Sequence, residues 1–559
     1  MPLSGSTAAL EPDAIRCWAA TSAAALRARR SDLDALNVFP VADSDTGTNL
    51  FLTLAEAAAA VERVPHDGSA DDLARAFGRG ALVGARGNSG VIVGQYLGAL
   101  VRALLPAPGL GGGEALVVSL QTLVGALDSA ASAAYQAVAR PVEGTVLTVG
   151  RAVGDHAAAL AAALAASVAA GGPPRRHHGP TAADPGGAVL AVLDEAIVEG
   201  YRALLRTTAQ LPALRAAGVL DAGAWGLLLV LDSLAHCLGS TAALERSAAG
   251  VRMPGARGPD QHADDPVGGG EFEVMYLVSS VARAQDGAGG GSPVLVRPAP
   301  DLGVSLRSGL SDIGDSAAVM GGDGLWQVHV HTDRPLEALD VAGALDGAVS
   351  QVRIRHLASQ AGVHGHHRPH LGVVVVTAAP GLVADLARSG AVVVLVPPGG
   401  TVGPELGRAV EDTGAARVLL LAAVPVADPP QVAGLEVLDE LSEPQLVCGA
   451  ATLASLDRSA EVEVLLAEAA RSVRAVRTTT VPAPGCGDVA GLRHGDLVRL
   501  AADRLLASGG TLVTVVTGCA TGHAALDALR ERVVHGPEGA ELLVLDGGAR
   551  GSDVALGVE

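Results

Sequence analysis

A series of helical segments at the start of the chain constrains the fold most. Between Glu11 and Leu238, Ala- and Leu-rich runs of helical length alternate with short stretches of Gly, Pro or Asp. The predicted helices span 12–30, 49–63, 70–83, 89–104, 115–138, 145–169, 188–208 and 222–237. Ser69, with Asp72 three residues later, predicts a capping box for the third helix. The pattern therefore predicts an all-α domain over residues 1–240.

The sequence pattern changes after this domain. Residues 241–270 are rich in Gly, Pro, Asp and Arg without periodicity, which predicts a linker. Short β-rich runs with helical pieces between them predict a small α+β domain over 271–362. A histidine-rich break at 363–370 predicts a second, solvated linker. Apolar runs alternating with helices then predict an α/β domain with a mostly parallel sheet over 371–559.

Length and charge limit the classes of partner. A chain of 559 residues is too long for one hydrophobic core. Its net charge of −20, from 39 basic and 59 acidic residues, opposes a nucleic-acid or anionic-membrane partner and suits a divalent cation. Without a signal-peptide pattern or an apolar stretch that could span a bilayer, we expect a cytoplasmic protein with no integral membrane segment.

The five cysteines give no metal or disulfide signal. They lie far apart and include no CxxC pair. The spacing therefore predicts neither a disulfide framework nor a cysteine-based zinc site. Cys486 and Cys519, which lack a recognisable His or Asp setting, are expected to be structural.

Three polar loops precede predicted helices and could bind a phosphorylated ligand. Asp43 and Asp45 lie in a stretch dense in Asp, Gly, Thr and Asn. Their two carboxylates would suit a site for Mg²⁺ and a nucleotide. Alternatively, the stretch is a turn that caps the next helix. Residues 84–90 form a Gly-rich loop whose backbone amides could hold a phosphate. Alternatively, this loop is a simple connection between two helices. Residues 218–226 form a third loop, with Asp221 as a candidate helix cap.

Four stretches in this order resemble the ATP-binding subunit of the bacterial fatty acid kinases. That family shares its N-terminal domain with the L subunit of dihydroxyacetone kinase. The matching stretches are LNVFPVADSDTGTN (36–49), GARGNSGVIVGQ (84–95), RPVEGTVLTV (140–149) and AGVLDAGAWGL (217–227). The resemblance implies an antiparallel barrel of eight helices whose loops at one end hold ATP and Mg²⁺.

The resemblance also implies a role for individual residues. Asp43 and Asp45 would be the catalytic magnesium ligands, with Asn37 as a helper. The implied phosphate contacts are Thr46, Thr48, Asn49, Asn88, Ser89 and Gly90. Thr145 and Asp221 to Gly223 would complete the nucleotide pocket. We see no general base in this domain, which fits a kinase component whose acceptor is brought by a partner.

Ser44 departs from the family pattern, which has Gly between the two aspartates. If the position needs a positive φ, Ser costs about 1 kcal/mol or more relative to Gly. This residue therefore bears directly on whether the site is active.

The middle domain contains a candidate metal site. Residues two apart on a strand face the same side, so His329 and His331 could bind one transition metal or could be a pair of surface histidines. In the fatty acid kinase family the matching HVH run is paired with a cysteine, and Glu273 stands at that position here. Glu273, His329 and His331 are therefore predicted ligands for Zn²⁺.

Three functions follow from these patterns. The first is transfer of the γ-phosphoryl group of ATP to a fatty acid carboxylate held by a separate lipid-carrying protein, with the C-terminal domain serving for docking. The second is a kinase of dihydroxyacetone or a similar polyol, and the third is a nucleotide-binding regulatory or scaffold protein. The oligomeric state stays open, with a homodimer among the alternatives.

Overall fold

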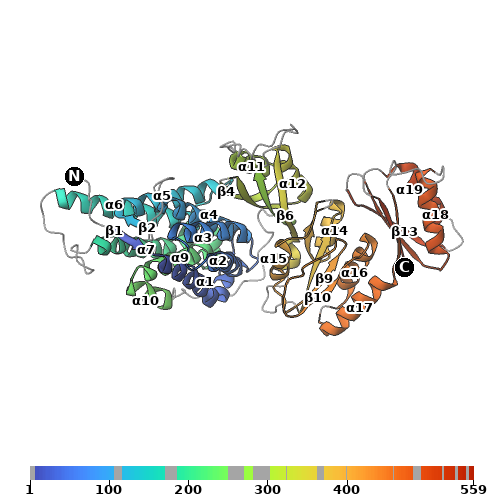
Figure 1. Cartoon of the computed structure of the whole chain (residues 1–559), viewed down its shortest axis with the longest axis horizontal. Coiled ribbons are helices and arrows are strands. Elements are labelled where there is room, and N and C mark those ends of the chain that lie inside the picture. The colour runs from blue at the N-terminus through green and yellow to red at the C-terminus, as the bar shows by residue number, and fades with distance from the viewer. Residues whose placement is uncertain are drawn as a thin grey trace. The chain divides into compact units, whose positions relative to one another are not determined.

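The computed structural model describes most of the chain (Figure 1). The described residues are 7–105, 116–169, 185–249, 270–280, 302–322, 324–361, 370–397, 400–457, 459–482, 493–518, 521–534, 539–548 and 553–559. Most of the two predicted linkers, at 241–270 and 363–370, lies outside these residues, as do Cys486 and Cys519. Helix α10 (Thr241–Ala249) occupies the beginning of the first predicted linker.

Helices dominate the chain up to residue 249, as predicted (Figure 1). They are α1 (Pro12–Ala35), α2 (Thr46–Glu62), α3 (Ala70–Gly84), α4 (Gly87–Leu104), α5 (Leu120–Ala137), α6 (Val146–Ala169), α7 (Pro185–Gln210), α8 (Pro212–Ala217), α9 (Ala222–Cys237) and α10. Two short strands, β1 (Thr7–Leu10) and β2 (Leu116–Ser119), pair in antiparallel fashion beside them. The predicted capping box at Ser69 and Asp72 is present at the start of α3.

Helix α9 lies at the centre of the helical region. Its residues from Ala222 to Ala235 are all buried, which is typical of a helix surrounded by others. The Trp18 indole on α1 donates a hydrogen bond to the Val230 carbonyl of α9, at 3.0 Å, and stacks on Phe77 of α3. These contacts join three helices around one aliphatic core.

A disulfide joins Cys17 of α1 to Cys237 at the end of α9. The prediction of no disulfide is therefore wrong. The two cysteines are 220 residues apart, and only the packing of α1 against α9 brings their Cα atoms to 6.1 Å. Cys448, the other cysteine among the described residues, is free and buried, consistent with a structural role.

An eight-stranded sheet follows the helical region. Its strand order is β10-β9-β7-β8-β6-β3-β5-β4. The strands are β3 (Phe272–Ser280), β4 (Asp315–Gly322), β5 (Leu325–Thr332), β6 (Gly347–His356), β7 (Leu371–Thr377), β8 (Val392–Leu395), β9 (Arg417–Ala422) and β10 (Leu435–Leu438). The helices between them are α11 (Leu302–Ser311), α12 (Pro335–Ala344), α13 (Leu357–Ala361), η1 (Pro380–Leu382), α14 (Val383–Arg388) and α15 (Glu405–Asp412).

The remainder of the chain forms a four-stranded sheet with the order β11-β14-β12-β13. Its strands are β11 (Arg477–Val481), β12 (Leu512–Thr517), β13 (Glu541–Asp546) and β14 (Val554–Val558). Helices α18 (His494–Leu506) and α19 (His523–Val534) pack against it (Figure 1), after α16 (Glu443–Ser455) and α17 (Val462–Ala475). Because β14 pairs antiparallel with both neighbours, and β6 antiparallel with β8, both sheets are mixed. The strands after residue 370 thus lie in two sheets where one was predicted; β7 to β10 pair in parallel as expected, and β14 is antiparallel.

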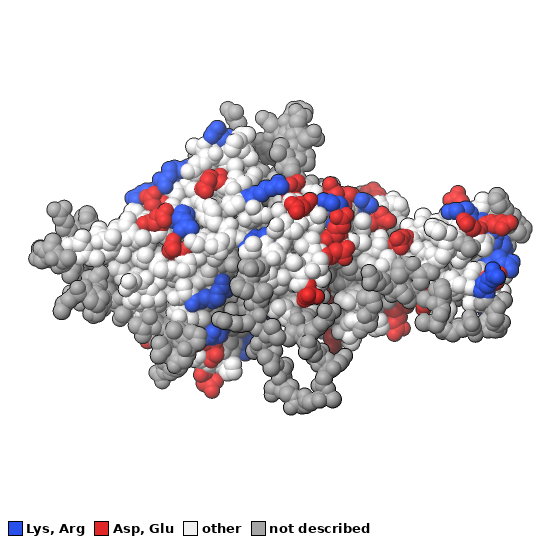
Figure 2. Space-filling model, turned by 90° about the horizontal axis from the view of Figure 1, so that it is seen from above, with Lys and Arg blue, Asp and Glu red and all other residues white. Residues whose placement is uncertain are grey.

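The chain packs as two compact units. The first comprises residues 1–269, 277–331 and 344–347, and the second the rest. Strand β4 thus belongs to the first unit, together with the helices. Among the described residues, no helix combines the length and apolarity needed to cross a bilayer. On the face drawn in Figure 2, basic side chains occur in small groups beside acidic ones.

Candidate active site

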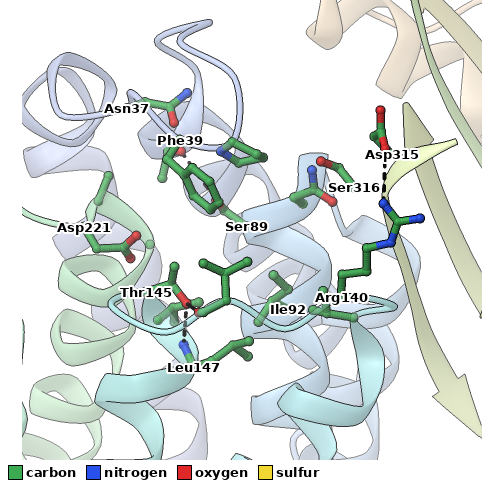
Figure 3. Close-up of a pocket in the computed structure, with 18 of the residues that line it drawn as sticks. Asn37, Phe39, Ser89, Ile92, Arg140, Thr145, Leu147, Asp221, Asp315 and Ser316 are labelled. Atoms are coloured by element: carbon green, nitrogen blue, oxygen red, sulfur yellow. Dashed lines mark hydrogen bonds and ion pairs between the residues drawn. The ribbon is translucent and has the colours of Figure 1, made fainter. Parts of the chain in front are cut away.

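A cavity of about 250 Å³ lies in the first unit, at the ends of several helices (Figure 3). Loops that are far apart in the sequence converge on it. The predicted nucleotide-binding residues that line it are Asn37, Thr46, Asn88, Ser89, Thr145, Asp221 and Gly223. The structure therefore brings together residues from all four stretches that the resemblance singled out.

Four helix N-termini point their first turns at this cavity. Helices α2, α4, α6 and α9 begin at or next to lining residues, namely Thr46, Asn88, Val146 and Ala222. The first N–H groups of a helix have no partner within the helix and carry the positive end of its dipole. Such ends are ready sites for phosphate, so four of them around one cavity suit a polyphosphate.

The loop before α2 carries the aspartate pair. Asp43 and Asp45 are only 8% and 7% exposed, and the Asn37 side-chain amide donates a hydrogen bond to Asp43 Oδ1. Ser44 between them has a φ of +54°, so the position does require the left-handed conformation. Carboxylate oxygens are the ligands that Mg²⁺ prefers, and the donor set of this loop therefore fits that ion.

The start of α2 is fixed against α1 by a polar network. The Thr48 backbone N–H and hydroxyl both donate to the Asp34 carboxylate, at 2.8 and 2.9 Å, and Arg30 Nε donates to the Thr48 hydroxyl. Thr48 is therefore used in holding the helix and does not line the cavity. Its predicted role at the phosphates has no geometric support here.

Asn49 and Gly90 also lie behind the lining residues. A Cβ atom on Gly87 would lie 2.3 Å from the Asn49 amide nitrogen, and one on Gly90 would lie 2.5 Å from the Thr53 hydroxyl. Close backbone approach thus seats the N-terminus of α4 against α2. The Thr46 and Ser89 hydroxyls are consequently 3.4 Å apart at the cavity surface.

Two polar side chains cap the other helices at the cavity. Thr145 Oγ1 accepts from the Leu147 N–H at the start of α6, and Asp221 Oδ1 accepts from the Ala224 N–H at the start of α9. Burial raises the pKa of the Asp221 carboxyl from 3.8 to about 6, although hydrogen bonds from the Ala224 and Val146 backbone N–H groups oppose the shift. Asp221 was predicted both as a cap and as a pocket residue, and it has both positions.

One wall of the cavity was not predicted from the sequence. Figure 3 shows Asn37, Thr145 and Asp221 on one side and Arg140, Asp315 and Ser316 on the other. The second wall comes from the loop after α5 and from residues 311–317 at the start of β4. Arg140 opens one of the four matched stretches, and its charge was a signal that could have identified it.

The predicted metal ligands Glu273, His329 and His331 are clustered. All three are buried, and each offers a ligand atom within 4.8 Å of the others. The two histidine Nε2 atoms are 3.1 Å apart, close to the roughly 3.3 Å between ligands of one tetrahedral Zn²⁺ at about 2.0–2.1 Å. The Arg355 guanidinium binds Glu273 Oε2 and so orients this carboxylate. The donor set therefore fits zinc.

Comparison with protein families identifies two parts of the chain. Residues 40–171 match the DAK2 domain, and residues 300–364 match the middle domain of FakA-like fatty acid kinase proteins. The chain thus joins a DAK2 domain to a fatty acid kinase-like middle domain. The resemblance to the ATP-binding component of the fatty acid kinases is confirmed.

Curated relatives match about half of the chain. Protein YloV of Bacillus subtilis is 29% identical over 338 residues, which is 59% of this chain and 52% of that protein. The uncharacterized protein SH1689 of Staphylococcus haemolyticus is 28% identical over 333 residues, with the same coverage. Uncharacterized protein MG369 of Mycoplasma genitalium is 28% identical over 253 residues, 45% of this chain and 40% of that protein. The chain spans about half the length of the relatives it matches.

The cavity draws on both matched regions. The DAK2 domain supplies Thr46, Ser89 and Thr145, and the middle-domain match supplies residues 311–317. His329 and His331 fall within the middle-domain match, whereas Glu273 precedes it. The cavity and the histidine pair thus both include residues of the matched middle domain.

Proposed function

We propose that this protein is the ATP-binding subunit of a fatty acid kinase. It transfers the γ-phosphoryl group of ATP to the carboxylate of a fatty acid held by a separate lipid-binding protein and releases an acyl phosphate. The observation that carries the proposal is the convergence of four helix N-termini on one cavity, with a buried aspartate pair in the loop directly before one of them, α2, in a chain with a fatty acid kinase-like middle domain.

In this mechanism the protein positions the reactants and neutralises charge. Asp43 and Asp45 hold Mg²⁺, which supplies positive charge to the phosphates when bound. The first turns of α2 and α4, with Thr46 and Ser89, donate hydrogen bonds to phosphate oxygens. Positioning and electrostatic stabilisation supply most of the rate in phosphoryl transfer, so these contacts suffice for the protein's part.

The acceptor carboxylate explains why the cavity needs no general base. A carboxylate oxygen is already deprotonated at neutral pH, so it attacks the γ-phosphorus directly as the bond to the ADP oxygen breaks. A hydroxyl acceptor would have to lose a proton. This chemistry favours a fatty acid over dihydroxyacetone.

The remaining regions have supporting roles in the proposal. The helical region would form the eight-helix antiparallel barrel of the family, and the C-terminal α/β region would dock the lipid-binding protein. Glu273, His329 and His331 would hold a structural Zn²⁺, which metal analysis of the purified protein would detect. We expect a cytoplasmic enzyme.

The test is an ATP-consumption assay with candidate lipid-binding proteins loaded with fatty acid, with hydroxylamine added to trap acyl phosphate. Asp43→Asn and Asp45→Asn should each lower partner-dependent turnover roughly 100-fold or more, because each removes charge opposite the phosphates. Asp128→Asn is the matched control, since Asp128 is an exposed carboxylate paired with Arg151 outside the cavity. Turnover that persists in both the Asp43 and the Asp45 variant would sink the magnesium assignment.

A further inference from the structure

The second wall of the cavity has its own chemical character. Among the described residues that line the cavity, Arg140 is the one with a basic side chain, and the apolar residues Val138, Ile92 and Ala317 line the same cavity (Figure 3 labels Arg140 and Ile92). The phosphate-binding first turns of the helices lie around Thr46 and Ser89. An exposed cation at the edge of a partly apolar cavity matches an acyl chain that ends in a carboxylate.

The backbone that carries Arg140 is firmly attached. Val138 forms an antiparallel bridge with Ala318 of β4, and the Ala139 N–H donates to the Ala317 carbonyl at 3.1 Å. Two further contacts seat β4 on α4: the Gly321 N–H donates to the Gln95 side chain, at 3.0 Å, and a small apolar cluster surrounds Met320. The position of the Arg140 Cα atom is thus fixed relative to the helix that begins at the cavity.

The Arg140 side chain itself is held only loosely. Its NH1 atom lies 3.6 Å from Asp315 Oδ1, and the two side chains are 74% and 49% exposed. Its NH2 atom lies 3.5 Å from the Ser311 carbonyl oxygen. Exposed ion pairs of this kind contribute little to stability, so the guanidinium can leave Asp315 for a better anion at small cost.

A bulge in β4 directs this wall toward the cavity. The pairing of β4 with β5 shifts register between Asp315 and Ala318, and Ser316 within the bulge has a φ of +53°. Bulges and residues in the left-handed region cost energy and often occur beside functional sites, where they re-aim side chains. Here the bulge brings Asp315, Ser316 and Ala317 to the cavity surface.

We propose that Arg140 binds the phosphoryl acceptor: its guanidinium exchanges the Asp315 carboxylate for the carboxylate of the acyl substrate and orients it for attack. This inference rests on the proposed kinase function. It assigns acceptor recognition to the wall made by Arg140 and the start of β4, and nucleotide recognition to the helix N-termini.

The test measures binding of octanoate to the full chain saturated with Mg²⁺ and the imido analogue of ATP, by titration calorimetry. Arg140→Gln should weaken octanoate binding roughly 10- to 100-fold, because a charge-assisted hydrogen bond is lost, while Arg140→Lys retains part of it. Asp315→Asn should strengthen binding up to about fivefold, because it removes the competing anion. If Arg140 had a purely structural role, Arg140→Gln and Asp315→Asn would not change the affinity for octanoate in opposite directions. Arg206→Gln, at an exposed Arg–Glu199 pair outside the cavity, is the control.

The outcomes separate this inference from the function itself. Equal octanoate affinity in the parent and Arg140→Gln, or no octanoate binding to the parent, overturns the inference. Loss of affinity for the imido analogue but not for ADP or octanoate also overturns it, since Arg140 would then bind the terminal phosphoryl group. If octanoate binds through Arg140 but the parent forms no acyl hydroxamate with any loaded lipid-binding protein, the kinase function fails and the binding assignment stands.

Discussion

Gly47, in the first turn of α2, allows the close contact between α2 and α1. A Cβ atom at this position would lie 2.2 Å from the Arg30 carbonyl oxygen and 2.8 Å from the Leu33 Cβ atom. Real Cβ atoms essentially never approach other atoms closer than 3.0 Å, and the first obstacle is backbone rather than a flexible side chain. Gly47→Ala therefore forces the start of α2 to move by roughly 1 Å in a packed interior.

The expected loss in the free energy of unfolding follows from this displacement. Overpacking of a well-packed site costs about 1–3 kcal/mol, and a backbone obstacle puts Gly47→Ala near the upper end. Replacing a glycine also stabilises the folded protein by about 0.4–1 kcal/mol, because the substitution lowers the conformational entropy of the unfolded chain. We therefore expect a net loss of about 2 kcal/mol, together with weaker binding of Mg-ATP, because Thr46 at the cavity moves with the helix.

Urea unfolding followed by tryptophan fluorescence measures this loss. The three tryptophans, Trp18, Trp225 and Trp326, all lie in the first compact unit. Gly125→Ala is the matched control: Gly125 is exposed on α5, a Cβ atom there would have nothing within 4 Å, and we expect a gain of about 0.5–1 kcal/mol. If Gly47→Ala unfolds at the same urea concentration as the parent, the helix contact is not as tight as described and the reasoning is refuted.

Three further predictions use the same unfolding assay. Because the pKa of Asp221 rises from 3.8 unfolded to about 6 folded, its stabilising effect is complete below pH 4 and is lost as the pH rises to 6. Asp221→Asn, which still caps α9, should therefore exceed the parent by up to about 3 kcal/mol at pH 7.5, with the difference shrinking toward pH 4. Cys17→Ser should cost about 2–5 kcal/mol under oxidising conditions, since the disulfide closes a loop of 220 residues, and dithiothreitol should then lower the stability of the parent but not of the variant. Ser44→Gly should gain up to about 1 kcal/mol by relieving the positive φ, whereas the β-branched Ser44→Val should lose at least about 1 kcal/mol; equal stability of all three proteins would contradict the strain at this position.

The helices were predictable because their signals are local. The 3.6-residue periodicity and the punctuation by Gly, Pro and Asp gave α3 and α9 almost to the residue. The condition set for Ser44 is met, since that residue has a positive φ, and the strain itself stays a prediction. Side-chain alternation and capping act within a few residues, so one sequence contains them in full.

The sheets and the disulfide depend on contacts between distant segments. Strand β14, at the end of the chain, inserts between β11 and β12 and makes the sheet mixed. An apolar run fits a parallel or an antiparallel neighbour equally well, so its own residues do not fix the pairing. The Cys17–Cys237 bond likewise depends on the packing of α1 against α9, which no spacing rule contains.

In the candidate site as well, some residues were predictable from local patterns and others were not. The loops at Thr46, Ser89, Thr145 and Asp221 were found because each carries its own polar pattern before a helix. The wall at 311–317 was missed because its residues acquire their position from a bulge and from pairing with β5. No local pattern of Asp or Ser predicts that a strand start will face a cavity made by helices.

Strand β4 connects the cavity with the histidine pair, which were predicted as two separate sites. Asp315 lies opposite His331 and Ala318 opposite His329 in the pairing of β4 with β5, and the bulge between them faces the cavity. A metal held by the two histidines would therefore fix the strand that supports the Arg140 wall, because neighbouring residues in a strand pair move together. The DAK2 match contains three of the four helix N-termini that suit a nucleotide, those of α2, α4 and α6. It also contains Arg140, while the middle-domain match contains the start of β4 behind that residue, so the wall that we assign to the acceptor draws on both matched regions.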